Sequence, residues 1–233
     1  SEPLDRVISE GCWTEMQDFS SEQSFEADWS AKKIKDDGSE VEIYFQGKNQ
    51  GTLNWSLIGE HNINNALAAI AAVRHVGVTC NDAIEALASF KNVKRRMELK
   101  EKINGINVYD DFAHHPTAIA TTLGGLRAKV ANKRILAVVD PRSNTMKMGV
   151  HKDTLINSVK QADLTIFHCP LGFDWQLDLS EQQQLSSLDS VDKIVEQLVQ
   201  FAQPDDTILI MSNGGFGGIH EKLIKALKQK WES

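Results

Sequence analysis

The sequence lacks a long apolar run, and it has few cysteines. Its longest apolar stretches, such as Ile135–Val139 and Thr207–Met211, fall far short of the roughly 20 residues that a membrane-spanning helix needs. The N-terminus is polar, so no secretory signal peptide is expected. The three cysteines, Cys12, Cys80 and Cys169, form no Cys-x-x-Cys pair. This pattern argues against a disulfide framework and favours a reducing, cytoplasmic compartment.

Positive charge is also scarce. The 25 Lys and Arg residues are outnumbered by 32 Asp and Glu residues, which gives a formal net charge of -7. Such a chain does not offer the basic surface that nucleic acids or anionic membranes require, so neither is an expected partner. One phosphorylated small molecule is compatible with this charge, because it needs only local donors. The 233 residues, 41% of them hydrophobic, suffice to bury a substantial core.

The first part of the chain reads as antiparallel hairpins followed by helices. Residues 41–45 alternate between apolar and polar side chains, and residues 36–38 and 47–51 are typical of turns. Helices are predicted at 62–76 and at 81–90, the second one opening on an Asn-Asp capping signal. The pattern changes near residues 91–96.

The second part alternates between helices and strands. Two strands, 97–102 and 106–109, flank Asn104-Gly105, which is typical of a type I′ turn. The elements that follow are helices at 116–131, 152–161, 191–201 and 219–230 and strands at 135–139, 164–168 and 207–211, with a polar loop at 181–189. This succession predicts an α/β fold, in which a Rossmann-like domain with a mostly parallel sheet follows the unit of hairpins and helices.

Titratable groups crowd the end of the predicted strand 106–109. Asp110 and Asp111 come first, then His114 and His115, then a Pro at a predicted helix start. Ligands of open α/β sheets bind at such junctions. A carboxylate here could accept ribose hydroxyls while His114 reaches a phosphate, or the two Asp and two His residues could bind a metal ion. The structural alternative is capping by Asp111 with one packed His.

Two other segments could contact a nucleotide. Gly59–Asn65 places Asn side chains at a helix start, where an Asn amide could pair with an adenine edge or simply cap the helix. Lys94–Arg96 offers guanidinium planes that stack on bases and pair with phosphates, although a solvated basic turn has the same composition.

Two segments could contact an anionic ligand. Arg142, Ser143 and Asn144 follow the strand 135–139 and could form a carboxylate clamp or a surface turn. Residues 212–220 carry four glycines within five positions between a strand and a helix, which lets the backbone approach an anion. A dinucleotide loop is the alternative, but that fingerprint normally follows the first strand of its fold.

In their order and spacing these segments resemble the Mur ligases of bacterial cell-wall synthesis. The motifs are Gly-Glu-His-Asn-x-x-Asn-Ala-Leu-Ala-Ala, Arg-Arg-x-Glu and Asp-Asp-Phe-Ala-His-His-Pro-Thr-Ala. Pro-Arg-Ser-Asn-Thr-Met and Ser-Asn-Gly-Gly-Phe-Gly-Gly resemble the member that reuses a tripeptide from old cell wall. The resemblance implies ATP- and Mg²⁺-dependent ligation of L-Ala-γ-D-Glu-meso-diaminopimelate to UDP-N-acetylmuramate through an acyl phosphate.

The resemblance also implies site residues, position by position. The implied nucleotide contacts are Asn62 and Asn65 at adenine with His61 beside them, Arg96 at the nucleotide, Asp111 at ribose and His114 near the phosphates. The implied peptide contacts are Arg142, Ser143, Asn144, Asn213, Gly214 and Gly215, where Asp-Pro-Arg stands in place of a related ligase's Asp-Asn-Pro-Arg. No catalytic residue and no metal ligand are assigned within the chain.

The sequence departs from the family pattern at the phosphate cradle. A P-loop reads Gly-x-x-x-x-Gly-Lys-Ser/Thr, but Gly47-Lys48 is followed by Asn49, and Glu42 replaces the first glycine. We therefore expect residues 1–93 to be the end of a central ATPase domain and residues 94–233 the complete C-terminal domain. The UDP-binding domain and the Mg²⁺ ligands would lie elsewhere, and the chain alone would be inactive.

Four other functions fit parts of the pattern. They are a nucleotide- or peptide-binding module, a metal-dependent hydrolase built on the Asp/His run, an NADH-dependent oxidoreductase using residues 214–218, and another Mur ligase that adds an amino acid.

Overall fold

The computed structural model describes residues 2–22, 26–142, 152–170 and 184–231. It separates into two compact units, Ser1–Phe90 and Lys91–Ser233, which are described one at a time. Within the described ranges, no helix is both long enough and apolar enough to cross a membrane. The α/β fold class predicted from the sequence is confirmed.

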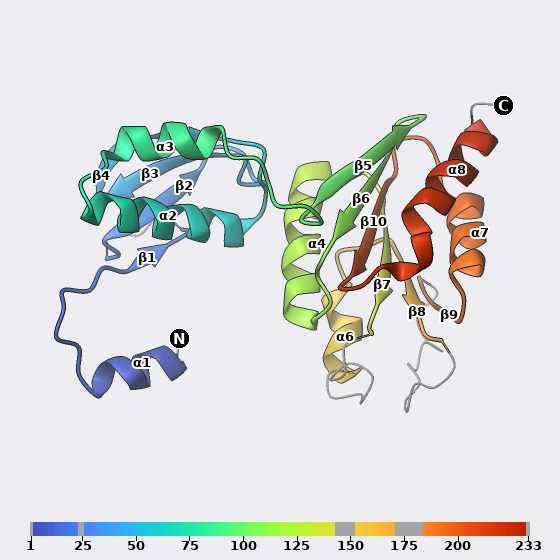
Figure 1. The fold of residues 1–233 in the computed structure, drawn as a ribbon, viewed down its shortest axis with the longest axis horizontal. Coiled ribbons are helices and arrows are strands. Elements are labelled where there is room, and N and C mark those ends of the chain that lie inside the picture. Colours follow the sequence, from blue (N-terminus) through green and yellow to red (C-terminus); the bar gives the residue numbers. More distant parts are fainter. Residues whose placement is uncertain (1, 23–25, 143–151, 171–183, 232–233) are drawn as a thin grey trace. The chain divides into compact units, whose positions relative to one another are not determined.

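The first unit is a four-stranded sheet with helices packed against it. After helix α1 (Glu2–Ser9) the strands run in the order β1 (Phe19–Ser20), β2 (Trp29–Lys33), β3 (Glu40–Phe45) and β4 (Lys48–Asn54). The β1–β2 pair is parallel and the other pairs are antiparallel. Helices α2 (Glu60–His75) and α3 (Cys80–Ala88) lie side by side over this sheet (Figure 1). Trp29, Ile43, Leu53, Ile63 and Leu67 are fully buried between the two layers.

Two local predictions for this unit were wrong. Residues 47–51, expected to form a turn, mostly belong to β4, because the tight turn is made by Gln46 and Gly47, whose φ angles are 47° and 72°. The N-cap of α3 is Thr79, whose hydroxyl accepts a hydrogen bond from the Asp82 amide, rather than the expected Asn-Asp pair. Strand β4 and helix α3 therefore both begin earlier than the sequence predicts.

The second unit is a six-stranded sheet with helices on both faces (Figure 1). Its strands are β5 (Glu98–Ile103), β6 (Ile106–Asp111), β7 (Ile135–Asp140), β8 (Leu164–His168), β9 (Leu185–Leu188) and β10 (Thr207–Ser212), and their order is β5-β6-β10-β7-β8-β9. Only the β5–β6 hairpin is antiparallel. Its turn, Asn104-Gly105, has φ angles of 45° and 81°, as a type I′ turn requires.

Strand β9 corrects the polar loop predicted for 181–189. Its residues Leu-Ser-Ser-Leu pair with β8 at the edge of the sheet and are half-buried or exposed. A short polar edge strand gives no alternating apolar pattern, so the sequence carries little signal for it.

Two apolar layers hold the helices to the sheet. Helices α4 (Pro116–Val130) and α6 (Lys152–Ser158) pack on one face, and α7 (Val191–Phe201) and α8 (Ile219–Trp231) pack on the other. Strands β7 and β10 are buried along their whole length, which is typical of central parallel strands. The parallel strands β6, β10, β7 and β8 therefore end at one common edge, with Ser212 in register with Asp140.

Candidate functional site

The carboxyl edge of the parallel sheet carries two arginine–aspartate pairs. Asp110 on β6 pairs with Arg95, and Asp140 on β7 pairs with Arg142. Strand β10, which ends at Ser212, lies between β6 and β7. Each carboxylate is almost completely buried, with 5% of Asp110 and 1% of Asp140 exposed.

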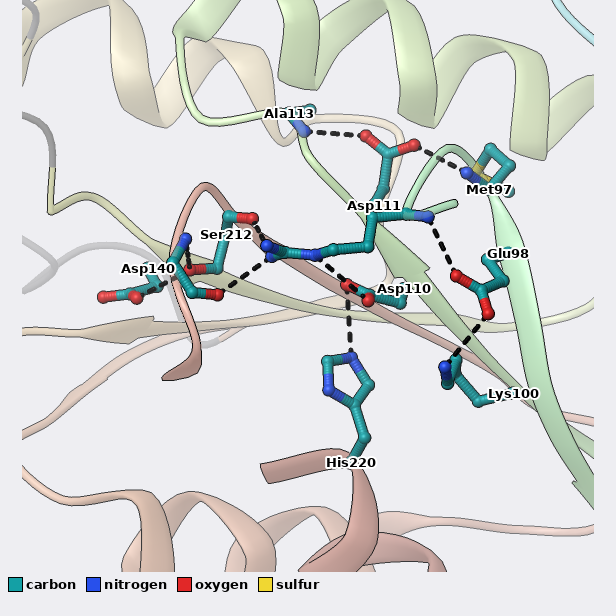
Figure 2. Close-up of polar contacts among 11 residues, drawn as sticks. Met97, Glu98, Lys100, Asp110, Asp111, Ala113, Asp140, Ser212 and His220 are labelled. Carbon is teal, nitrogen blue, oxygen red and sulfur yellow. Dashed lines mark hydrogen bonds and ion pairs between the residues drawn. The ribbon is translucent and has the colours of Figure 1, made fainter. Parts of the chain in front are cut away.

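Asp110 contacts two basic side chains. Its Oδ2 lies 3.3 Å from Arg95 Nε, and its Oδ1 lies 3.3 Å from His220 Nε2 at the start of α8 (Figure 2). Asp110 Oδ1 and His220 Nε2 are close enough for an ion pair. Neither atom has a hydrogen-bond partner among the described residues. Burial raises the pKa of Asp110, but His220 and Arg95 outweigh it and hold that pKa below its ordinary value.

Arg95 also holds the segment after β10. Its Nη2 donates hydrogen bonds to the carbonyl oxygens of Ser212 and Gly214, the latter at 2.9 Å. We refer to residues 213–218 as the glycine loop. Arg95 therefore joins the end of β6 to the start of the glycine loop.

Asp140 collects three polar partners at the end of β7. Its Oδ1 lies 3.0 Å from His168 Nδ1, and its Oδ2 accepts from Ser212 Oγ at 2.8 Å and pairs with Arg142 Nε at 3.0 Å. Ser212 Oγ in turn accepts from the Gly214 amide at 3.1 Å. Because Asp140 satisfies groups from β8, β10 and its own loop, it fixes the relative positions of all three.

Gly214 lies directly against Arg142. A Cβ atom placed on Gly214 would lie 2.2 Å from Arg142 Nη1 and 2.9 Å from its Cδ. Only glycine allows this approach, because any side chain would overlap the guanidinium. Arg142 is thus held at Nε by Asp140, while its side chain as a whole is 42% exposed. Such a guanidinium can bind a carboxylate.

Asp111 faces the opposite side of the sheet from Asp110 (Figure 2). Its Oδ2 accepts from the Met97 amide and its Oδ1 from the Ala113 amide, each at 2.8 Å, and only 3% of the residue is exposed. Burial raises the pKa of Asp111, and the two amide hydrogen bonds offset only part of that effect. The side chain stabilises its own loop, although the N-cap position of α4 belongs to His115.

An aromatic cluster follows Asp111. The guanidinium carbons of Arg95 and Arg96 lie 5.3 and 5.4 Å from the Phe112 ring centre, and Arg96 is exposed. His114 Nδ1 is 2.9 Å from the Phe112 carbonyl oxygen. A carbonyl can only accept, so Nδ1 carries a proton, and Nε2 can donate to a phosphate only when the ring is doubly protonated.

The predicted adenine-contacting residues lie in the first unit. Asn62 Nδ2 donates to the Ile58 carbonyl at 2.8 Å, while His61 and Asn65 are exposed. The N-cap of α2 is Gly59, and no side chain caps it. The capping explanation of these asparagines is therefore wrong, and their contact with adenine stays a prediction.

The predicted peptide-contacting residues are only partly described. Arg142, Asn213, Gly214 and Gly215 lie at the carboxyl edge, and Arg142 and Gly214 are in contact. Ser143 and Asn144 lie outside the described residues.

The metal site considered for the Asp/His run does not form. Asp110 and Asp111 are on opposite faces, and the described part of the chain contains no group of three His, Cys, Asp or Glu side chains placed to hold an ion. The strand was expected to end at Tyr109, but it continues to Asp111, so the alternation of side chains separates the two carboxylates.

Four residues of this edge received no individual role from the sequence, although Arg95, Asp140 and His220 belong to segments that were considered as sites. They are Arg95, Asp140, His168 and His220. Asp140 and His168 end β7 and β8, so position at a strand end was the available signal. Arg95 has a φ angle of 60°, in the left-handed region, and the sequence gives no sign of that conformation.

A Rossmann-like sheet with polar side chains at its carboxyl edge is the arrangement in which α/β domains bind their ligands. The chain belongs to the Mur ligase family: the glutamate ligase domain of that family matches residues 95–214, more than half of the chain, and its middle domain matches residues 11–73. This confirms the family resemblance seen in the sequence.

Two individual relatives show which members of the family this chain is similar to. The UDP-N-acetylmuramate–L-alanyl-gamma-D-glutamyl-meso-2,6-diaminoheptandioate ligase of Escherichia coli (strain K12) is 49% identical over 99% of this chain and 50% of its own length. The crystal structure of a murein peptide ligase from Psychrobacter arcticus 273-4 is 42% identical, with a TM-score of 0.68 over 97% of this chain and 49% of that one. The chain thus spans about half the length of these relatives.

A more distant structure shows the fold alone. The MurF ligase of Thermotoga maritima, solved in complex with ADP, matches with a TM-score of 0.74 at 19% identity, over 98% of this chain and 52% of that one. The Mur ligase family is ATP-dependent.

Proposed function

We propose that this chain supplies nucleotide and peptide contacts to an ATP-dependent ligase that joins L-Ala-γ-D-Glu-meso-diaminopimelate to UDP-N-acetylmuramate in peptidoglycan recycling. The observation that carries the proposal is the 49% identity to the Escherichia coli ligase over 99% of this chain. The muramate carboxylate is activated as an acyl phosphate, and the amine of the tripeptide attacks it. Because the chain spans 50% of that relative, the complete activity needs further parts of the same polypeptide.

The division of labour follows the two units. Residues 1–93 form the end of the central ATPase domain, and residues 94–233 form the C-terminal domain. The match of the family's middle domain to residues 11–73 and of its glutamate ligase domain to 95–214 supports this assignment. The phosphate cradle and the UDP-binding domain are supplied from outside these residues.

The proposed nucleotide contacts are described for each unit by itself, Asn62, Asn65 and His61 in the first unit and Arg96 and His114 in the second. Asn62 and Asn65, with His61 beside them, contact adenine; Arg96 contacts the nucleotide, and His114 contacts the phosphates when doubly protonated. The exposed guanidinium of Arg96 beside Phe112 supports its part.

Asp111 fits a ribose contact less well than the sequence indicates. Two backbone amides already occupy its oxygens, and a third donor, Thr122 Oγ1, lies at 3.4 Å. A carboxylate has about four acceptor positions, so one remains for a ribose hydroxyl. We retain the ribose role on that ground, with a second role in fixing the backbone at Met97 and Ala113.

The tripeptide is held at the carboxyl edge of the second unit. Arg142 binds a carboxylate of diaminopimelate, together with Ser143 and Asn144, and Asn213, Gly214 and Gly215 line the pocket. The contact between Gly214 and Arg142, and the hold of Asp140 on Arg142 Nε, support a cation set in a defined position.

The surroundings follow from the same proposal. Mg²⁺ supports phosphoryl transfer in such a ligase, and its ligands lie outside this chain. The partners are UDP-N-acetylmuramate, the tripeptide and the remaining domains, with no nucleic acid or membrane, and the compartment is the cytoplasm.

The test is a ligation assay on the complete enzyme. With ATP, Mg²⁺ and UDP-N-acetylmuramate, mass spectrometry should detect the coupled product from the tripeptide and little from L-alanine. The purified 233-residue chain should form no product under the same conditions. Preferential use of L-alanine by the complete enzyme, or ligation by the 233-residue chain alone, would contradict the proposal.

A further inference from the structure

Arg95 lies in the middle of the polar network at the carboxyl edge, although it is none of the proposed contact residues. It reaches Asp110 through Nε and the glycine loop through Nη2. We propose that Arg95 is a positioning residue for the tripeptide: it fixes the start of the glycine loop and thereby the backbone against which Arg142 is seated. This inference rests on the proposed function.

The backbone of Arg95 is itself held in an unusual conformation. Arg95 and Met97 have φ angles of 60° and 47°, which non-glycine residues adopt at a cost. Two buried or half-buried carboxylates compensate, since the Arg95 amide donates to Glu98 Oε2 and the Met97 amide to Asp111 Oδ2, each at 2.8 Å (Figure 2). The Arg95 side chain therefore leaves the backbone in a fixed direction.

The guanidinium then makes bonds that only arginine can make together. Nε faces a carboxylate while Nη2 donates to two carbonyls, that of Ser212 at the end of β10 and that of Gly214 in the glycine loop. A lysine ammonium would keep the charge near Asp110, but it lacks the rigid planar fork that spans these acceptors. The arginine geometry, and not the charge alone, sets the position of the loop.

The loop position matters because Gly214 is held from two sides. Its carbonyl accepts from Arg95, and its Cα faces Arg142 so closely that a Cβ would overlap Nη1. Its amide donates to Ser212 Oγ, which donates to Asp140, the partner of Arg142. A shift of Gly214 would therefore move the surface on which Arg142 rests, whereas the proposed nucleotide contacts Arg96 and His114 lie outside this chain of bonds.

The chain offers a matched control in Arg134. Its Nε pairs with Asp206 at 3.6 Å, its side chain is 36% exposed, and its partner is 4% exposed. Arg95 Nε lies 3.3 Å from Asp110, and the side chains of Arg95 and Asp110 are 31% and 7% exposed. Arg134 precedes β7 at the opposite edge of the same sheet, so its loss removes a similar ion pair without touching the glycine loop.

The experiment compares Arg95→Ala, Arg95→Lys and Arg134→Ala in the complete ligase. Both Arg95 variants should raise the KM for the tripeptide by about tenfold, and leave the KM for ATP within about twofold, since charge-assisted bonds to the loop are lost. Arg134→Ala should leave both constants unchanged. Arg95→Lys retains a charge near Asp110, so it serves as the folded variant if Arg95→Ala does not accumulate.

A second readout does not depend on substrate. Hydrogen–deuterium exchange of peptides covering 212–218 should become faster in Arg95→Lys than in the wild type or Arg134→Ala. Equal rises of the KM for tripeptide and ATP, or unchanged exchange in this segment, would overturn the positioning role. A wild-type enzyme that does not use the tripeptide would overturn the proposed function and the substrate part of this inference, while the exchange result would still decide whether Arg95 holds the loop.

Discussion

The contact between Gly214 and Arg142 allows a sharp test with one methyl group. In Gly214→Ala the new Cβ would lie 2.2 Å from Arg142 Nη1 and 2.9 Å from Cδ. Ordinary contacts between such atoms are about 3.5 Å, so the guanidinium must move by roughly 1 Å or more. The Arg142 Nε–Asp140 Oδ2 distance is 3.0 Å, and a displacement of this size breaks the pair.

The cost to stability should be small. Arg142 is a flexible side chain, 42% exposed, and partly exposed ion pairs contribute about 1 kcal/mol or less. Asp140 keeps its contacts with Ser212 and His168, so the buried carboxylate is not left alone. We therefore expect the midpoint of thermal unfolding to fall by no more than a few degrees.

The cost to substrate binding should be large. Misplacement of a binding group by about 1 Å can reduce catalytic efficiency up to a hundredfold, so the KM for the tripeptide should rise at least tenfold in the complete ligase. The KM for ATP should change by less than about twofold. Gly124→Ala is the control, because a Cβ at this helical position meets no atom within 4 Å and should leave both constants unchanged.

Two outcomes would refute this reasoning. One is an unchanged KM for the tripeptide in Gly214→Ala, which would mean that the position of Arg142 does not matter for the substrate. The other is an equal loss of ATP and tripeptide binding together with a large fall in unfolding temperature, which would mean that the methyl group disrupts the whole edge.

Two further predictions concern the adjacent carboxylates. Asp111→Asn should lower the free energy of unfolding, measured in urea, by about 1–3 kcal/mol. The NH2 group of the asparagine would face the N–H of Met97 or of Ala113, so two donors would meet. Unchanged stability would contradict the backbone role. Asp110 has its folded pKa below the ordinary 3.8, so its contribution is present at neutral pH and lost as the pH falls through that folded pKa. Asp110→Asn should therefore lose less stability than the wild type between about pH 6 and pH 3, and an equal loss would refute this assignment.

The elements of the second unit were largely predictable because its strands are apolar and its turns carry strong signals. Strands β7, β8 and β10 and helix α7 fall within one residue of their expected bounds. The side chains of these strands are buried on both faces, so the pattern does not depend on unknown partners, and α7 shows one apolar face. Strand β9 was missed because pairing with β8, rather than its own composition, makes it a strand.

The presence of polar side chains at the strand ends was predictable, but the orientation of these side chains was not. The aspartates at 110 and 111 indicated the end of a strand, because charged side chains rarely continue a buried one. Arg95 and Met97 stabilise these carboxylates from a left-handed backbone, so the strand runs on and the two side chains separate. The sequence around Asp110 does not indicate its partner Arg95, which lies 15 residues away and has a positive φ angle.

The two arginines of this edge are both held at Nε by a buried aspartate, but their outer nitrogens have different surroundings. Nη2 of Arg95 donates to two backbone carbonyls, so this nitrogen is committed to the protein. Arg142 is held by Asp140 at Nε, and its side chain is 42% exposed. A guanidinium anchored on one edge can offer its other edge to a carboxylate in a fixed plane. Under the proposed function, we therefore expect the same chemical group to support the glycine loop beside β6 and to meet the carboxylate of the substrate beside β7.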